Sequence, residues 1–265
     1  MSQRLPHGFF IPDPEQGSAP RNVRRRPGIR TVLWTLLLLI AVAVILYAGV
    51  FRIRTVTVVG NRRFSWGDVV KAAGLEGGVS YFAVNEDKIK TALETNSYLA
   101  YEGLEKSFPS SLTLYVRERT ARANMKSMGV IYLIDETGRV LERMPNNQLR
   151  EDLPIVTGLQ PIEATPGRDL VPRTADQLTY YTELMQEMVL QGYWGEVSEL
   201  ILTDPDSLCL ITRNGYTIRL GDHENLRAKL GTVRGVTAKL AEMGEYGGVI
   251  EASTPEVAVY SPATE

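Results

Sequence analysis

The side chains best suited to catalysis are two carboxylate pairs, Asp135/Glu136 and Asp204/Asp206. Two neighbouring carboxylates are what a glycoside hydrolase needs, because one acts as acid and the other as base or nucleophile. Both pairs, however, occur in turn-like sequences, Asp-Glu-Thr-Gly and Asp-Pro-Asp-Ser, where aspartate is favoured because it bonds to the nearby backbone. We therefore interpret both as turn residues and keep a glycosidase pair as the alternative.

Other catalytic or metal-binding residues are scarce. The chain has two histidines, His7 and His223, and one cysteine, Cys209, so no internal disulfide can form. Cys209 lies in a Ser-Leu-Cys-Leu-Ile run, which predicts a small buried residue inside a strand rather than a reactive thiol. No spacing suits a zinc site, and the phosphate-binding, dinucleotide-binding and nucleophile-elbow motifs are absent. The sequence predicts a protein that is not an enzyme and has no cofactor or metal.

Residues 31–50 form an uncharged stretch with one glycine and no proline. A helix of this length covers about 30 Å, the thickness of the hydrocarbon core of a bilayer. Trp34 and Tyr47 lie near its ends, where aromatic side chains favour the interface. The stretch predicts a single transmembrane helix. A cleaved signal peptide, whose apolar core would be shorter, and a buried core helix are the alternatives.

Charge on the two sides of this helix predicts its orientation. Residues 1–30 contain six arginines against two carboxylates, a net charge of +4, and the rest of the chain carries −6. Positive flanks stay in the cytoplasm, so residues 51–265 are expected outside, as in a type II membrane protein. The proline- and glycine-rich residues 1–30 predict a disordered cytoplasmic tail. A body of net negative charge gives no footprint for nucleic acid, and the lipid bilayer is the expected non-protein partner.

Residues 51–119 show the pattern of a small α+β domain. Alternating valines and threonines at 54–58 predict a strand with one buried face. Ser65 and Asn85 are expected to cap two helices, and extended stretches follow at 98–106 and 112–119. This order predicts a three-stranded sheet with two helices on one face. The first helix is expected to end at Gly74 and to bury one stripe, namely Trp66, Val69, Val70 and Ala73.

Residues 120–261 predict a mixed, mostly antiparallel β domain with two helices, followed by a tail at 262–265. The predicted strands are a hairpin over 129–143 and later strands near 196–203, 207–213, 216–220, 249–253 and 256–260. The helices are expected to begin at Thr174, in a capping-box sequence, and at Asp222. An apolar stripe on the first helix, which includes Met185 and Met188, is interpreted as core rather than as a binding groove.

Several short motifs follow the predicted transmembrane helix in a fixed order. They are Phe51–Asn61 (FRIRTVTVVGN), Val70–Leu75 (VKAAGL), Tyr81-Phe82, Phe108-Pro109, Leu112–Arg119 (LTLYVRER), Asp135–Val140 (DETGRV), Leu153–Gly158 (LPIVTG) and Tyr216–Gly221 (YTIRLG). In this order and spacing they resemble the FtsQ/DivIB family of membrane-anchored bacterial cell-division proteins. The resemblance implies that 51–119 is a POTRA domain, which docks partner chains and has no catalytic groups, and that 120–261 is the family's β domain. Glu251 departs from the family pattern, in which an aspartate is common, so the register of the last strands is left open.

The resemblance also implies a site and partners. In the family, the last strands of the β domain bind FtsB/DivIC and FtsL by strand addition. By position, the partner-binding residues here would be Glu256, Val257, Val259 and Tyr260, with Tyr260 as an aromatic anchor. The expected function is a scaffold at the division septum that links these partners to the septal peptidoglycan synthase complex. Two alternatives remain open, a membrane-anchored cell-wall enzyme and a POTRA-type chaperone for exported chains.

Overall fold

The computed structural model describes residues 28–49 and 51–263 of the chain. The chain divides into two compact units, Met1–Tyr47 and Ala48–Glu265. The first described element is α1 (Ile29–Gly49), whose segment Ile29–Tyr47 is long and apolar enough to cross a membrane and is not buried by the protein. This helix coincides with the predicted transmembrane segment at 31–50. The tail predicted at 1–30 lies almost wholly outside the described residues, as do the last two residues of the tail at 262–265.

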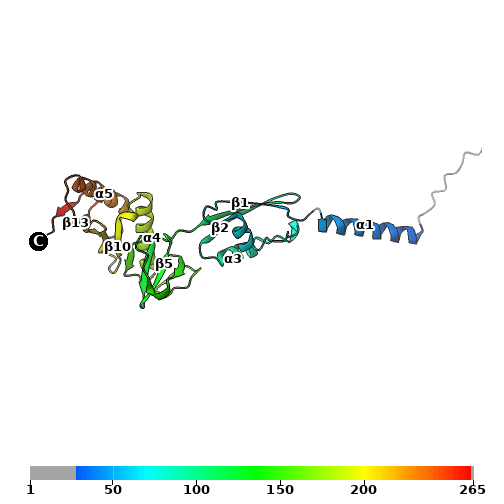
Figure 1. The fold of residues 1–265 in the computed structure, drawn as a ribbon, viewed down its shortest axis with the longest axis horizontal. Helices are drawn as coiled ribbons and strands as arrows, with labels where there is room; N and C mark the ends of the chain where they lie inside the picture. Colours follow the sequence, from blue (N-terminus) through cyan, green and yellow to red (C-terminus); the bar gives the residue numbers. More distant parts are fainter. Residues whose placement is uncertain (1–27, 50, 264–265) are drawn as a thin grey trace, which may run out of the picture. The chain divides into compact units, whose positions relative to one another are not determined.

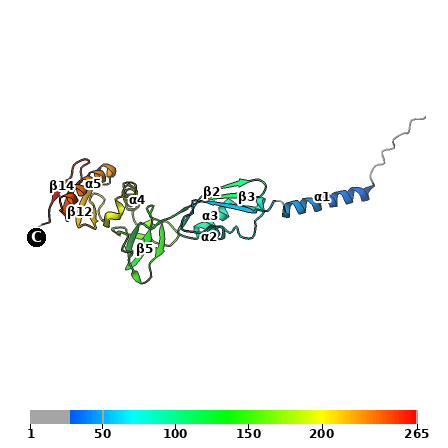
Figure 2. The same cartoon turned by 45° about the horizontal axis from the view of Figure 1, so that its top comes forward.

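A three-stranded domain follows α1. Its elements are β1 (Thr55–Val59), α2 (Trp66–Ala72), the 3-10 helix η1 (Tyr81–Ala83), α3 (Glu86–Glu94), β2 (Leu99–Ser107) and β3 (Ser111–Glu118). The strand order is β1-β3-β2, with β1 parallel and β2 antiparallel to β3. Both helices cover one face of this sheet (Figure 1, Figure 2). The predicted order of strands and helices is thus confirmed.

Local capping explains where the two helices of this domain begin. The Ser65 side chain accepts from the Asp68 amide while the Asp68 carboxylate accepts from the Ser65 amide, which is the predicted capping box. The Asn85 side chain accepts from the Lys88 amide, as predicted. Trp66, however, is exposed rather than part of the buried stripe, and its indole Nε1–H donates to the Val56 carbonyl at 2.8 Å.

The second domain is built on a nine-stranded mixed sheet with the order β14-β13-β12-β11-β10-β7-β4-β5-β6. Antiparallel pairs outnumber parallel ones, so the predicted sheet type is confirmed. The strands are β4 (Ala123–Ser127), β5 (Val130–Ile134), β6 (Val140–Arg143), β7 (Ile155–Thr157), β10 (Val197–Ile201), β11 (Leu208–Thr212), β12 (Tyr216–Gly221), β13 (Gly248–Glu251) and β14 (Val259–Ser261). A separate two-stranded sheet pairs β8 (Pro161–Glu163) with β9 (Val171–Pro172).

Two helices, α4 (Ala175–Leu190) and α5 (Leu226–Glu242), pack against each other and close the core of this domain (Figure 1, Figure 2). Tyr181, Met185 and Met188 on α4 are fully buried in that core. The interpretation of this methionine-containing stripe as core is therefore confirmed. Burying a side chain of this size contributes about 1.5–3 kcal/mol relative to leaving it exposed.

Two helix caps were predicted wrongly. Thr174 precedes α4, but its side chain makes no capping hydrogen bond. Asp222 does not cap α5. The residue before that helix is Asn225, whose φ of 55° lies in the left-handed region. The Asp222 carboxylate accepts instead from the ammonium of the buried Lys229 at 2.6 Å. This charge-assisted bond lowers the pKa of Asp222 below its ordinary value, because Lys229 favours the ionised carboxylate.

Candidate partner-binding edge

The last strand, β14, forms one edge of the nine-stranded sheet, and β13 is its neighbour within that sheet. The pairing is antiparallel and aligns Val259 with Glu251, Tyr260 with Ile250, and Ser261 with Val249. The edge strand of a sheet presents backbone N–H and C=O groups on its outer side, to which another chain can pair.

The register identifies which backbone groups of β14 face outward. The Ala252 N–H donates to the Arg219 carbonyl of β12, so Ala252 and Ile250 direct their backbone groups towards β12. Because neighbouring residues of a strand alternate, Val249 and Glu251 direct theirs towards β14. Ser261 and Val259 therefore make the hydrogen bonds between β13 and β14. The N–H and C=O groups of Tyr260 face the open side of the edge.

The side chains of successive strand residues point to opposite faces of the sheet. The Tyr260 ring packs against the domain core and meets Tyr216 edge to face, with 6.3 Å between ring centroids. Val259 points to the other face and is 58% exposed. Pro262 follows the strand and has no N–H, so strand pairing on the outer side has no donor at that position.

The predicted strand at 256–260 differs from the observed one, which covers Val259–Ser261. Glu256 has a φ of 63°, in the left-handed region, and the Val257 N–H donates to the Thr254 carbonyl to close a turn. Both residues therefore lie in the turn before β14, with Val257 56% exposed. The structure places the predicted site residues in one short segment, but only Val259 and Tyr260 belong to the strand.

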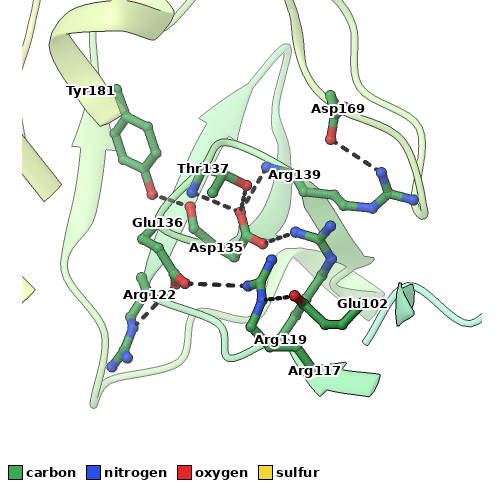
Figure 3. A network of polar contacts seen from close by, with 10 residues as sticks. All are labelled: Glu102, Arg117, Arg119, Arg122, Asp135, Glu136, Thr137, Arg139, Asp169 and Tyr181. Atoms are coloured by element: carbon green, nitrogen blue, oxygen red, sulfur yellow. Dashed lines mark hydrogen bonds and ion pairs between the residues drawn. The ribbon is translucent and has the colours of Figure 1, made fainter. Parts of the chain in front are cut away.

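The Asp135 carboxylate, one of the candidate catalytic groups, is fully buried in a network of polar contacts (Figure 3). One oxygen accepts from Arg119 Nη1 at 2.7 Å. The other accepts from the amide and hydroxyl of Thr137 and from the Arg139 amide, at 2.7–2.9 Å. The Tyr181 hydroxyl donates to the Asp135 carbonyl. These contacts confirm the turn interpretation of Asp135, and they tie the end of β3 to the turn between β5 and β6.

Two of the remaining carboxylates, Glu136 and Asp204, also have structural contacts. Glu136 lies 3.5 Å from Arg122 and 3.9 Å from Arg117 (Figure 3), and the guanidinium of Arg122 lies 4.8 Å above the Trp194 ring. The Asp204 side chain accepts from the Asp206 amide, which is the local bond expected of a turn aspartate. Asp135, Glu136 and Asp204 thus take part in turns and ion pairs within the described residues.

Cys209 and His223 are likewise accounted for by packing. Cys209 lies in β11 and is half-buried, and burial raises the pKa of its thiol, which disfavours the reactive thiolate. The His223 ring contacts the Tyr180 ring, with 4.6 Å between centroids and 43° between the ring planes. Within the described part of the chain no group of three His, Cys, Asp or Glu side chains is placed to hold a metal ion.

Sequence reasoning missed two features of these sites. It did not find the Arg119–Asp135 pair, because the two residues lie 16 positions apart and nothing local links them. It also did not find that the Tyr260 backbone, rather than its ring, faces outward. That feature depends on the pairing of β12, β13 and β14. The sequence of the last strand alone gave no signal for it.

The architecture defines a class of protein: an apolar N-terminal helix, a small three-stranded α+β domain and a larger mixed β domain with an open terminal edge. Residues 51–119 match the family model described as a POTRA domain of FtsQ type. Residues 121–252 match the model described as the C-terminal part of the cell-division protein FtsQ/DivIB. The chain belongs to the FtsQ/DivIB family of bacterial cell-division proteins.

Curated relatives agree with this assignment. A cell division protein FtsQ of Syntrophotalea carbinolica is 24% identical over 193 residues, which covers 72% of this chain and 66% of the relative. An FtsQ of Myxococcus fulvus is 26% identical and covers 81% and 76%, respectively. A DivIB of Clostridium tetani is 21% identical and covers 77% and 76%. Family membership supports a role in cell division and partners among division proteins in general.

Among solved structures, the major extracytoplasmic domain of DivIB from Geobacillus stearothermophilus is similar to this chain. The match has 16% sequence identity and a TM-score of 0.31, and it covers 47% of this chain and 96% of that domain.

Proposed function

We propose that this protein is a non-enzymatic scaffold of the division machinery that binds partner chains along the β14 edge. Its proposed parts are the membrane anchor at 31–50, the POTRA domain at 51–119 and the β domain at 120–261. The partners proposed are the extracytoplasmic segments of FtsB/DivIC-like and FtsL-like proteins, which would connect it to septal peptidoglycan synthesis. The proposed location is the septal membrane, with the N-terminus in the cytoplasm.

One observation carries this proposal: the N–H and C=O groups of Tyr260 face outward from an edge strand. An incoming strand would pair with these groups, and the exposed Val257 and Val259 would contact its side chains. The Tyr260 ring would act indirectly, because its packing against Tyr216 holds β14 in place. Apolar side chains in a partly exposed edge are consistent with an interface that becomes buried on association.

The test compares three forms of the full-length chain in lipid nanodiscs. Tyr260→Ala removes the ring, and Tyr260→Pro removes both the ring and the outward N–H. A proline is tolerated there because that N–H makes no bond within the sheet. Binding to the extracytoplasmic FtsB/DivIC-like segment of the same bacterium is measured by biolayer interferometry. We expect Tyr260→Ala to weaken binding at least tenfold, about 1.4 kcal/mol, and Tyr260→Pro to weaken it further.

The matched control is Met128→Ala, which removes an exposed side chain from the turn between β4 and β5 and should leave affinity unchanged. Hydrogen exchange of β13 and α5 verifies that each variant is folded. Parental affinity in the folded Tyr260→Pro form would exclude strand addition at this edge. Equal losses of affinity in the alanine and proline variants would show that the partner contacts side chains and does not pair with the Tyr260 N–H.

A further inference from the structure

Four aromatic rings, here called the four-ring cluster, meet at one end of the three-stranded domain. They are Phe51, Tyr81, Phe82 and Phe108. Phe51 contacts Phe82 and Phe108 with centroid distances of 5.2 and 5.6 Å, and Tyr81 contacts the same two rings at 5.5 and 5.8 Å. Three segments far apart in the sequence therefore converge to build one aromatic surface.

Backbone hydrogen bonds hold this cluster in place, yet two of its rings are exposed. The Tyr81 amide donates to the Phe51 carbonyl at 2.7 Å, and an isolated bridge joins Arg52 to Ser80. Phe82 is nevertheless 59% exposed and Phe108 is 68% exposed. Fixed, exposed phenylalanine rings in a contiguous group are a sign of an interaction surface rather than of a core.

Two cationic residues lie close in sequence to members of the cluster. Arg52 follows Phe51 directly, and its guanidinium donates to the carbonyls of Gly77 and Gly78 at 2.6–2.7 Å. Lys106 lies two residues before Phe108 and donates to the Val84 carbonyl at 2.8 Å. Bonds to neutral carbonyls fix these groups without cancelling their charge. Exposed aromatic rings, with cations nearby in the chain, suit the interfacial layer of a membrane with anionic headgroups.

The covalent chain limits how far the cluster can lie from the bilayer. The apolar segment of α1 ends at Tyr47, four residues before Phe51. Four extended residues span at most about 14 Å. The headgroup layer on each side of the hydrocarbon core is about 5–8 Å thick. Phe51 therefore lies within or close beside the headgroup layer if α1 crosses the membrane, whatever the orientation of the domain.

We propose that the four-ring cluster inserts into the interfacial layer of the membrane that α1 spans, and so holds the three-stranded domain against the phospholipid surface. This inference rests on the proposed membrane anchor but not on partner binding. It assigns a lipid-binding role to one end of this domain. The domain would then be fixed at a set depth and angle instead of turning freely on the residues that follow α1.

The test measures membrane depth at Ser107, an exposed neighbour of Phe108 outside the cluster. The full chain carries Cys209→Ser and Ser107→Cys, labelled with a nitrobenzoxadiazole dye, in vesicles of phosphatidylcholine and phosphatidylglycerol. Quenching by lipid with a headgroup-level nitroxide reports contact with the interface. The reference label is at Met128→Cys in the other domain. We expect the Ser107 label to lose most of its emission and the Met128 label to lose little.

Two double variants test whether quenching of the Ser107 label requires the four-ring cluster. Phe82→Ser with Phe108→Ser should reduce quenching at the Ser107 label to the level seen at Met128. Leu149→Ser with Leu190→Ser also removes two exposed apolar side chains, from the other domain, and should change nothing.

Carbonate extraction tests the membrane anchor separately from the lipid contact of the four-ring cluster. If the chain stays in the vesicles while the Ser107 label is unquenched, or if quenching survives the double phenylalanine variant, the inference is overturned and the anchor stands. A chain extracted by carbonate would overturn both.

Discussion

At the residue scale, Arg119 and Asp135 form a buried ion pair with 2.7 Å between Nη1 and the carboxylate. Asp135 is fully buried and the Arg119 side chain is 11% exposed, so each charge depends on the other for compensation. Removing one member of such a pair leaves an uncompensated charge in a medium that solvates it poorly. We therefore expect the position that resembled half of a catalytic pair to stabilise the fold instead.

We predict that Asp135→Asn lowers the free energy of unfolding by about 3–5 kcal/mol, because it strands the Arg119 charge. The loss should appear as a lower urea midpoint and as faster hydrogen exchange in β5 and β6. Asp169→Asn is the control, since Asp169 is 72% exposed in its pair with Arg139 and should contribute only about 0–1 kcal/mol. Equal midpoints for the two variants would show that the buried pair is not a stabilising contact.

Glu118, at the end of β3, provides a pH-dependent contact. Its carboxylate accepts from the backbone amides of Arg62, Arg63 and Phe64 at 2.6–2.9 Å. Burial by itself raises the pKa of Glu118, but these amide donors outweigh it, and the net pKa lies below the ordinary value. The loop between β1 and α2 is thus fastened to β3 by the ionised form of one side chain.

We predict that this loop loses stability in acid. Since the folded pKa of Glu118 is lowered, its contribution is fully present above the unfolded pKa of about 4.3 and is lost as pH falls through the folded value. Hydrogen exchange of residues 62–64, corrected for intrinsic rates, should show greater opening at pH 3 than at pH 7. Glu118→Gln should open the loop by about 1–2 kcal/mol at pH 7 and remove most of the pH dependence. A parental pH response in that variant would assign the effect to other groups.

At the scale of elements, the sequence predicted what short-range chemistry determines. The Ser65 and Asn85 caps each use hydrogen bonds that span three residues, so their signal is complete within a few letters. The three-stranded domain was predicted in the right order because one face of each strand is buried and the side chains alternate accordingly. Gly60 follows β1 at a position where a Cβ atom would lie 1.9 Å from the Val116 carbonyl oxygen.

Elements set by long-range contacts were missed or misplaced. β4 shows no alternation because Ala123, Asn124 and Met125 are all buried. The Asn124 side-chain amide donates to the carbonyls of Arg150 and Leu153, far along the chain. A polar residue therefore occupies a core position with its donors hydrogen-bonded. The last strand was predicted at 256–260, whereas the structure shows it at Val259–Ser261, on an edge of the sheet. Its outward backbone groups follow from the register of three strands, which no single segment specifies.

At the scale of the whole molecule, the two proposed surfaces, the four-ring cluster and the β14 edge, lie far apart in the sequence. The four-ring cluster begins within four residues of the apolar segment of α1, whereas β14 lies at the end of the described chain. Both proposals place residues 51–263 on the same side of the membrane, and both require a partner or lipid surface that is present there. The side of the membrane on which residues 51–263 lie is therefore central to both proposals.

We predict that residues 51–263 lie outside the cytoplasm, because six arginines before α1 favour retention of the N-terminus inside. In a Cys209→Ser background, a membrane-impermeant maleimide should label Met128→Cys in spheroplasts without lysis, since Met128 is almost fully exposed. Ser2→Cys should be labelled only after lysis. The reverse pattern would place the β14 edge in the cytoplasm, out of reach of the extracytoplasmic partners proposed for it. It would leave the four-ring cluster free to bind the inner leaflet, so this measurement tests the scaffold proposal independently of the lipid inference.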